Sequence, residues 1–237
     1  MSNRLVKAWV FGGACLLLAG CGDDDFDVAR QVGPNPELPP PSWSLLPDLK
    51  VAEVVGWQEG ETPAVPEGFV VTAYAQDLAN PRTVHTLPNG DVLVVQSAGS
   101  GGEDKETNLV TLLRDTNRDG QVDERSDLLT GLTSPFGVAW HDGTLYVAAA
   151  DAILSYPYEL GQTEIAIAPT VLTPLPGGPI NHHWTKDLAL SPDGRFLYAS
   201  VGSNSNAGER GLEAEKGRAA IWQVDRETGA SRVFASG

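Results

Sequence analysis

The sequence predicts an all-β fold, because short apolar runs alternate with glycine-containing turns from about residue 66 to the end of the chain. The turns are marked by the dipeptides Asn89-Gly90, Asp119-Gly120, Asp142-Gly143 and Asp193-Gly194. Asn-Gly and Asp-Gly tolerate the positive φ angles that tight hairpin turns need. No long run has the 3.6-residue period of an amphipathic helix. The pattern therefore indicates antiparallel hairpins.

Each expected strand is a short apolar run between two turn signals. The first run alternates with period two and places Phe69, Val71 and Ala73 on one side. The expected strands comprise residues 69–74, 92–95, 110–113, 138–140, 145–148, 188–190, 196–200 and 221–224. A further strand is expected near Leu128.

A repeat narrows the fold class to a β-propeller. In three segments an apolar strand, a turn and a second apolar strand follow one another, and the turn glycines are Gly90, Gly143 and Gly194. These glycines are 53 and 51 residues apart. A period of about 40–50 residues with four short strands per unit is typical of propeller blades. A β-sandwich is the alternative, but its hairpins need not recur at a fixed spacing.

Residues 66–237 are long enough for about three such blades. A propeller closes with about four blades or more, and three blades would leave edge strands that promote aggregation. We therefore expect either a truncated chain or closure by self-association. Truncation is favoured, because residues 233–237 contain no capping segment.

The N-terminus has the pattern of an export signal. Arg4 and Lys7 give a positive start, and residues 8–20 are almost entirely apolar or small, in a run too short to span a bilayer as a helix. The run ends at Cys21 in a Leu-Ala-Gly-Cys sequence, which resembles the lipobox of bacterial lipoproteins. Cleavage after residues 1–20 would leave Cys21 as a lipid anchor. An ordinary secretory signal that happens to end in cysteine is the alternative.

Residues 21–65 are predicted to be an acidic, proline-rich tether. Three aspartates occupy residues 23–25, and residues 34–41 are too rich in proline for a regular helix or a central strand. In lipoproteins of bacteria with two membranes, an Asp after the lipidated Cys favours retention in the inner membrane. Gly22 occupies that place here. We therefore expect the lipid to anchor the chain in the outer membrane, facing the periplasm.

Charge and cysteine content argue against a nucleic-acid-binding protein and against a disulfide-stabilised domain. The net charge of −15 and the pI of about 4.5 argue against a nucleic-acid partner, because no basic patch could neutralise phosphate charge. The chain has two cysteines. Cys15 lies in the segment expected to be removed, and Cys21 is the expected lipid site. The exported domain is therefore expected to lack disulfides.

Residues 115–124 match the start of a calcium-binding loop. Calcium favours several oxygen ligands that converge on one point. The candidate ligands are the side chains of Asp115, Asn117 and Asp119, the backbone carbonyl of Gln121, and Asp123 or Glu124. Gly120 occupies the sixth position of the loop, where glycine is required. Ser126 occupies the twelfth position, where such loops usually have Glu. A polar hairpin loop without an ion is the alternative.

Two further segments could carry chemistry. His182 and His183 are adjacent, and neighbouring residues on a strand point to opposite faces, so an extended segment would not let both bind one metal. A structural histidine is the alternative for each. Residues 201–206 form a polar, glycine-containing segment after a strand, which suits either a binding loop or an ordinary surface loop. Dinucleotide-binding, P-loop, serine-hydrolase and zinc-protease motifs are absent.

An ordered set of short motifs resembles sorbosone dehydrogenase-like proteins, which are similar to the soluble quinoprotein glucose dehydrogenases. The resemblance covers the chain from about Pro66 to its end. The matching segments are residues 68–69, 80–82, 114–123, 134–137, 183–187, 191–194, 201–203 and 218–221. Each motif alone is weakly specific, and their order makes the set more specific.

The resemblance implies a six-bladed propeller that binds pyrroloquinoline quinone (PQQ) and Ca²⁺ on its axis. It implies oxidation of sugars or related alcohols and aldehydes, with an external electron acceptor. By motif match, His183 is the catalytic base, and His182 and His183 are the cofactor contacts. The axial Ca²⁺ would be distinct from an ion at Asp115. Further arginines and calcium ligands are expected beyond Gly237.

Two other functions stay open from the sequence. A non-catalytic propeller, tethered to the surface for binding or assembly, would bind no quinone. A metal-dependent lactonase on a similar propeller would need axial carboxylate and asparagine ligands, which this sequence does not place.

Overall fold

The structure, a computed structural model, describes residues 27–37, 53, 55–58, 60–98, 107–178 and 180–236. It divides into two units, residues 1–59 and 60–237, each of which is described by itself. The expected signal peptide and Cys21 lie outside the described residues, so the lipid anchor and the boundary at residue 66 stay predictions. No helix in the described ranges is long and apolar enough to cross a membrane.

The first unit contains one short element among its described residues, the 3-10 helix η1 (Val28–Gln31). The side chain of Asp27 caps it by accepting the N–H of Ala29 at 2.9 Å.

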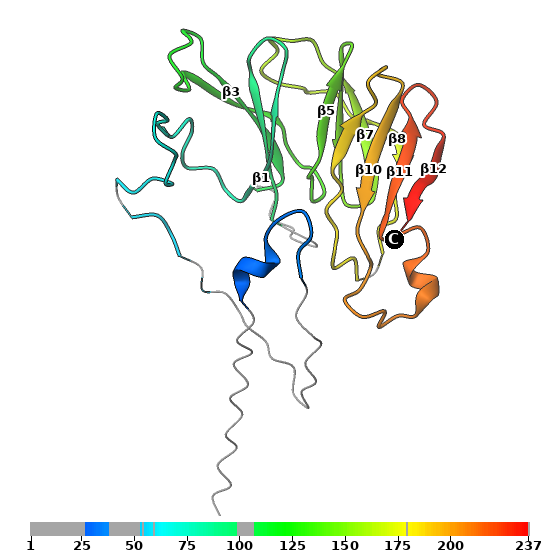
Figure 1. The fold of residues 1–237 in the computed structure, drawn as a ribbon. Coiled ribbons are helices and arrows are strands. Elements are labelled where there is room, and N and C mark those ends of the chain that lie inside the picture. Colours follow the sequence, from blue (N-terminus) through cyan, green and yellow to red (C-terminus); the bar gives the residue numbers. More distant parts are fainter. Residues whose placement is uncertain are drawn as a thin grey trace, which may run out of the picture. The chain divides into compact units, whose positions relative to one another are not determined.

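The second unit consists of three four-stranded antiparallel sheets (Figure 1). The first sheet contains β1 (Pro81–Thr86), β2 (Val92–Gln96), β3 (Leu109–Arg114) and β4 (Glu124–Leu129). The second contains β5 (Val138–His141), β6 (Thr144–Ala148), β7 (Ala152–Pro157) and β8 (Thr170–Pro174). The third contains β9 (Leu188–Leu190), β10 (Phe196–Val201), β11 (Ala220–Asp225) and β12 (Ser231–Ser236), with the 3-10 helix η2 (Leu212–Glu215) between β10 and β11. Strands follow one another in sequence order within each sheet, as in propeller blades.

The predicted turns join strands as expected. The glycines of the four dipeptides have positive φ angles: 94° at Gly90, 86° at Gly120, 77° at Gly143 and 70° at Gly194. They lie in the turns between β1 and β2, β3 and β4, β5 and β6, and β9 and β10. The all-β class and the three propeller-like blades are therefore confirmed, whereas a total of six blades stays a prediction.

Two apolar cores hold the sheets together. Between the first and second sheets, Leu93, Leu112 and Leu145 are fully buried. Between the second and third, Tyr146, Ile153 and Leu197 are buried. Within the second sheet, β6 is buried on both faces and reads as a nearly continuous apolar run.

The predicted strand at residues 69–74 is wrong. This segment has no regular structure, and Phe69 and Val70 are largely exposed. Alternation alone does not make a strand, because backbone groups need a neighbouring ladder, and none of the described strands pairs with this segment. The predictions also missed β7, an inner strand with buried Ile153 and Tyr156, and the edge strands β8 and β12, which are mostly exposed.

Each sheet runs up and down, so its connections gather at two ends. The hairpin end carries the turns within strand pairs: residues 87–91, 115–123, 142–143, 158–169, 191–195 and 226–230. The loop end carries the remaining described connections: residues 130–137, 149–151, 175–178, 180–187 and 202–219. In Figure 1 the hairpin end lies at the top of the sheets, and the loop end with η2 lies at the bottom. The predicted calcium loop and the predicted histidine therefore lie at opposite ends.

Candidate functional site

The predicted histidine lies at the loop end, in the connection that leads into β9. His183 is exposed and forms a turn with His182, so the segment is not extended as one of the sequence alternatives assumed. Its Nε2 lies 3.1 Å from Oδ1 of Asn206, in the connection between β10 and β11. The backbone N–H of His182 donates to the carbonyl of Asn204 at 3.0 Å. The fold thus brings the histidines together with the predicted polar loop at residues 201–206.

Gly202 lets the polar loop approach this histidine closely. A Cβ at Gly202 would lie 2.5 Å from Cβ of His183 and 2.6 Å from its carbonyl oxygen. Real Cβ atoms do not approach other atoms so closely, so any larger residue would displace one of the two loops. The contact fixes the backbone that carries the histidine.

Two carboxylates hold residues 204–207 of the same loop. Glu215 accepts the N–H groups of Asn204 and Ser205 at 2.7 and 3.1 Å. Glu209 accepts those of Asn206 and Ala207 at 3.3 and 3.0 Å. The Ala207 N–H contributes most to lowering the pKa of Glu209 to about 2, and the Ser205 hydroxyl contributes most to lowering that of Glu215. Both side chains therefore act as ionised caps.

A buried lysine follows the histidine by three residues in the sequence. Lys186 is completely buried, and its Nζ donates to the carbonyl of Trp184 at 3.0 Å. Burial, followed by the nearby charge of Arg218, lowers its pKa to about 8. A cation this poorly compensated is costly to bury, which makes the position unusual for a purely structural one.

Arg218 and Asn204 present donors that no described residue accepts. Arg218 is 6% exposed, and its Nη1 donates to Oδ1 of Asn181 at 2.9 Å. Its Nη2 and the Nδ2 of Asn204 are buried without a hydrogen-bond partner among the described residues. Both groups lie close to Gly178, where a Cβ would be 2.8 Å from Nη2 and 2.7 Å from Oδ1 of Asn204. Buried donors are nearly always paired, so these two mark a place that lacks an acceptor.

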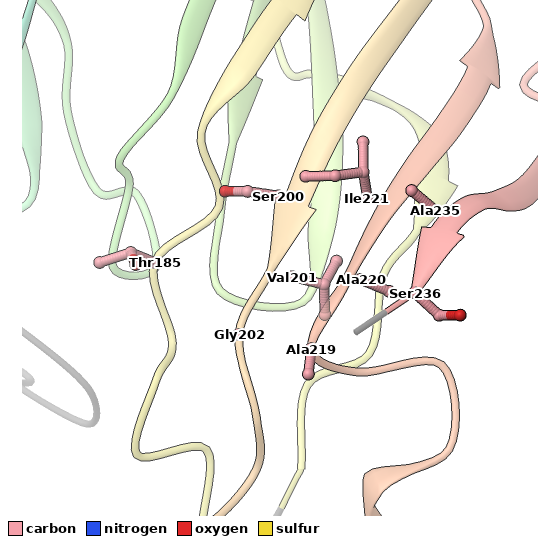
Figure 2. A pocket seen from close by; sticks show the side chains of 9 residues that line it. All are labelled: Thr185, Ser200, Val201, Gly202, Ala219, Ala220, Ile221, Ala235 and Ser236. Carbon is pink, nitrogen blue, oxygen red and sulfur yellow. The ribbon is translucent and has the colours of Figure 1, made fainter. Parts of the chain in front are cut away.

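Two pockets flank these residues. One, of about 520 Å³, is lined by Thr133, Ala150, Asp151, Leu175, Gly177, Gly178 and Asn181. The other, of about 450 Å³, is lined by Thr185, Ser200, Val201, Gly202, Ala219, Ala220, Ile221, Ala235 and Ser236. Figure 2 shows this second pocket at the loop ends of β10, β11 and β12, with mostly small and apolar side chains. Because Gly178 lines the first and Gly202 the second, both pockets adjoin the histidine and arginine loops.

An aromatic contact joins the three sheets beside the histidine. Trp184 is buried, and its ring meets the ring of Phe136 edge to face, with centroids 6.1 Å apart. The guanidinium of Arg82, from β1, lies 5.8 Å from the centroid of the same ring. The residue after His183 is therefore held by the first two sheets as well as by its own.

The predicted calcium loop forms the turn between β3 and β4 at the hairpin end. Oδ1 of Asp115 accepts the N–H groups of Arg118 and Asp119 at 2.6 and 3.2 Å, and its Oδ2 accepts that of Gly120 at 2.8 Å. The amide of Asn117 accepts the Asp119 N–H at 2.9 Å. These carboxylate and amide oxygens organise the turn.

The remaining predicted ligands close the same loop. Asp123 accepts the N–H of Thr116 at 2.7 Å, and the Thr116 hydroxyl contributes most to lowering the pKa of this aspartate. The N–H of Gln121 donates to Asp119 at 2.9 Å. Across the described residues, no three His, Cys, Asp or Glu side chains form a cluster that could hold a metal ion. Calcium at this loop stays a prediction.

Comparison with known families decides the membership of the chain. The family model described as TrAA12-like matches residues 63–236. The chain belongs to the TrAA12-like family. No curated protein matches the chain.

Solved structures share the fold of the TrAA12-like chain. The PQQ domain of a pyranose dehydrogenase from Coprinopsis cinerea, in its holo form, matches with a TM-score of 0.57 and 21% identity, over 72% of this chain and 42% of that one. A family AA12 carbohydrate-active enzyme from Trichoderma reesei matches with a TM-score of 0.57 and 20% identity, over 70% and 41%. A calcium structure of the Trichoderma family AA12 protein matches with a TM-score of 0.50 and 20% identity, over 66% and 38%. The TrAA12-like chain thus spans about two fifths of the chains that it matches.

Sequence reasoning found His183 and the polar loop but missed the residues that surround them. Lys186 and Arg218 entered only as parts of motifs, and Glu209 and Glu215 were not considered. Each of the two cations lies two residues before a strand of the third sheet, Lys186 before β9 and Arg218 before β11, and this position alone does not predict burial. No local sequence pattern predicts the roles of Glu209 and Glu215, because the N–H groups that they accept are brought to them by the path of the loop.

Proposed function

We propose that the TrAA12-like chain is part of a PQQ-dependent dehydrogenase that oxidises a sugar or a related alcohol or aldehyde. The family membership supports this proposal, and so does the likeness in fold to a pyranose dehydrogenase PQQ domain. The observation that carries it is the group of unpaired donors beside the histidine loop at the loop end.

The residues present fit such a cofactor. PQQ is a flat quinone that carries several carboxylates, so its site needs buried donors and positive charge. Nη2 of Arg218 and Nδ2 of Asn204 are buried donors without a partner among the described residues, and Lys186 adds a second buried cation. The unpaired Nη2 of Arg218 suits a carboxylate oxygen, because arginine donates strong charge-assisted hydrogen bonds to carboxylates. Arg218 and Asn204 are therefore the groups proposed to hold the cofactor on this chain.

His183 is proposed to act as the base of the reaction. When bound, the quinone supplies an acceptor for the hydride of the substrate. The imidazole of His183 is exposed at the loop end, where it can take the proton of a substrate hydroxyl. Asn206 orients the ring, and the packing of Gly202 fixes its backbone. His182 is proposed to contact the cofactor from the same turn.

Calcium is the second proposed cofactor. The residue types in residues 115–123 suit this hard ion, because they offer carboxylate and amide oxygens, but these oxygens accept N–H groups within the turn and would have to reorient to bind it. The ion would stiffen the turn between β3 and β4 at the hairpin end, away from His183. Calcium titration followed by proteolysis tests this part: protection of residues 115–123 is expected, and an equal cleavage rate with and without calcium contradicts it.

The setting of the protein is also proposed from its sequence. Cys21 would hold the chain by lipid in the outer membrane, and electrons would leave to an external acceptor in the periplasm. Metabolic labelling with a fatty acid, compared between the native chain and Cys21→Ser, tests the anchor.

The central experiment uses the protein purified from the cells that make it. With PQQ and calcium added, we expect dye-linked oxidation of aldoses or of sorbosone-like substrates. His183→Ala is expected to abolish oxidation while PQQ binding remains, whereas Arg218→Met is expected to weaken PQQ binding. A matched control is Arg195→Met, an exposed arginine in the turn between β9 and β10 at the hairpin end. Absence of PQQ binding in the native protein would overturn the proposal in favour of a non-catalytic propeller.

A further inference from the structure

We propose that Asn206 is a positioning residue that holds His183 in the tautomer protonated on Nε2, so that Nδ1 carries the free lone pair. The importance of this tautomer rests on the proposed function, in which His183 accepts a proton. The hydrogen bond itself and the loop that supports it do not depend on the cofactor.

The orientation assigned to the Asn206 amide sets the tautomer that we propose. Nε2 of His183 lies 3.1 Å from Oδ1 of Asn206, and an amide oxygen can only accept a hydrogen bond. With the amide oxygen facing the ring, Nε2 is the donor, and a neutral imidazole then has its lone pair on Nδ1. No described residue forms a hydrogen bond with that nitrogen. Nδ1 is left for a substrate hydroxyl.

The backbone around Asn206 is unusually well fixed for an exposed loop. Four consecutive N–H groups, from residue 204 to residue 207, are accepted by the carboxylates of Glu215 and Glu209. Hydrogen bonds to an ionised carboxylate are about twice as strong as neutral ones. The position of the Asn206 backbone is therefore set before any ligand binds.

The same loop also holds the segment that carries the histidine. Oδ1 of Asn204 accepts the N–H of Asn181 at 3.1 Å, and its backbone carbonyl accepts the N–H of His182 at 3.0 Å. Asn204 and Asn206 lie on one short loop, and Asn181 and His183 lie on another. The bond between His183 and Asn206 thus joins two loops that are already connected to each other. A ring turned away from Asn206 would lose this bond.

The experiment measures the tautomer directly, by nitrogen NMR of the His183 imidazole in the full chain labelled with ¹⁵N-histidine. Spectra are recorded without cofactor, at a pH where the ring is neutral, and His183→Gln identifies the resonances. The native chain is expected to show the Nε2-protonated form. Asn206→Leu is expected to give a mixture of tautomers. Asn206→Asp keeps an oxygen acceptor and is expected to restore the native pattern.

Ser203→Ala is the matched control, because Ser203 lies in the same loop and bonds to the carbonyl of Ser205 but not to His183. It is expected to leave the tautomer unchanged. In the active protein, Asn206→Leu is expected to lower kcat by roughly tenfold to a hundredfold with little change in KM, since general-base catalysis needs the lone pair on the correct nitrogen.

The outcomes separate this inference from the proposed function. A native chain protonated on Nδ1, or an Asn206→Leu spectrum identical to the native one, overturns the inference even if His183 proves essential for oxidation. Conversely, a protein that binds no PQQ but shows the expected tautomer series contradicts the proposed function and leaves the role of Asn206 intact.

Discussion

The two ends of the sheets differ in how their buried cations are paired. At the hairpin end, Arg114 binds both oxygens of Asp91, with Nε and Nη2 at 2.7 and 2.8 Å from them. The same guanidinium also donates to the carbonyl of Gly161, in the connection between β7 and β8. At the loop end, Lys186 has one bond to a neutral carbonyl, and Arg218 has a donor without a partner among the described residues.

We interpret this difference as that between a structural end and the end proposed to carry the site. A buried ion pair that satisfies both partners contributes to one rigid arrangement of strands. Buried cations without matching acceptors lower stability, and proteins retain such groups mainly where a ligand or a reaction needs them. The hairpin end is therefore expected to lose stability when its charges are removed, and the loop end is expected to gain it.

The largest effect is expected from Asp91→Asn. This change leaves the guanidinium of Arg114 facing a neutral amide in a site where the native carboxylate is 4% exposed. Breaking one side of a buried pair costs about 3 to 5 kcal/mol, and we expect about 3 kcal/mol because Arg114 is partly exposed. Chemical denaturation monitored by circular dichroism measures this loss.

Glu124→Gln is the control for that prediction. Glu124 contacts the same arginine at 3.3 Å but is exposed, so its loss should change the free energy of unfolding by less than about 1 kcal/mol. Equal losses for Asp91→Asn and Glu124→Gln would show that the hairpin end does not depend on its buried pair.

The opposite sign is expected for Lys186→Met at the loop end. The lowering of the Lys186 pKa to about 8 corresponds to about 3 kcal/mol of unfavourable free energy for the charged form at neutral pH. Methionine fills similar space without charge, but leaves the Trp184 carbonyl without its donor. We therefore expect a net stabilisation of about 2 kcal/mol at pH 7, with weaker PQQ binding. A destabilised variant would show that Lys186 supports the fold and would remove the contrast between the two ends.

The same lysine predicts a dependence of stability on pH. Its pKa is lower in the folded state than its ordinary value of 10.5, so the unfolded state binds more protons between about pH 8 and 10.5. The free energy of unfolding of the native chain should therefore rise across this range relative to Lys186→Met. Denaturation curves at pH 7, 8, 9 and 10 measure the difference, and parallel pH profiles for the two proteins contradict it.

A smaller loss is expected from Gly202→Ala. The added Cβ would lie 2.5 Å from Cβ of His183, so one loop must move, and overpacking of this kind costs roughly 1 to 3 kcal/mol. The same change should alter the imidazole signals of His183. Ala207→Ser, in the exposed part of the loop, is the comparison, and unaltered His183 signals in Gly202→Ala would show that the contact does not position the histidine.

The sequence predicted the hairpin end well because its signals are local. An Asp-Gly or Asn-Gly turn between apolar runs depends on few neighbours, and all four dipeptides form turns between strands. The segment at residues 69–74 failed for the opposite reason. Its alternation is a local property, whereas a strand also needs a partner with free backbone groups.

The loop end was predicted only in part because its contacts join distant residues. His183 was found from a motif, but its partner Asn206 is 23 residues away. The bond from Arg218 to Asn181 spans 37 residues. Such pairs are set by the way in which the second and third sheets pack, and no spacing rule within the sequence fixes them. The unpaired donors were therefore invisible until the fold was known.

The smallest effect on global stability, and the sharpest local one, is expected from Glu209→Gln. Glu209 is exposed, so its loss should leave the denaturation midpoint almost unchanged. Because its pKa is lowered from 4.5 to about 2, the native carboxylate should protect the N–H groups of Asn206 and Ala207 fully above pH 4.5 and lose this effect as the pH falls through about 2. Hydrogen exchange at these two amides measures that protection.

In Glu209→Gln we expect fast exchange already at pH 5, while amides of β10 keep their protection. Equal exchange in the two proteins would mean that the loop is held without Glu209, and the fixed position of Asn206 would then have to come from Glu215 and Asn204 alone.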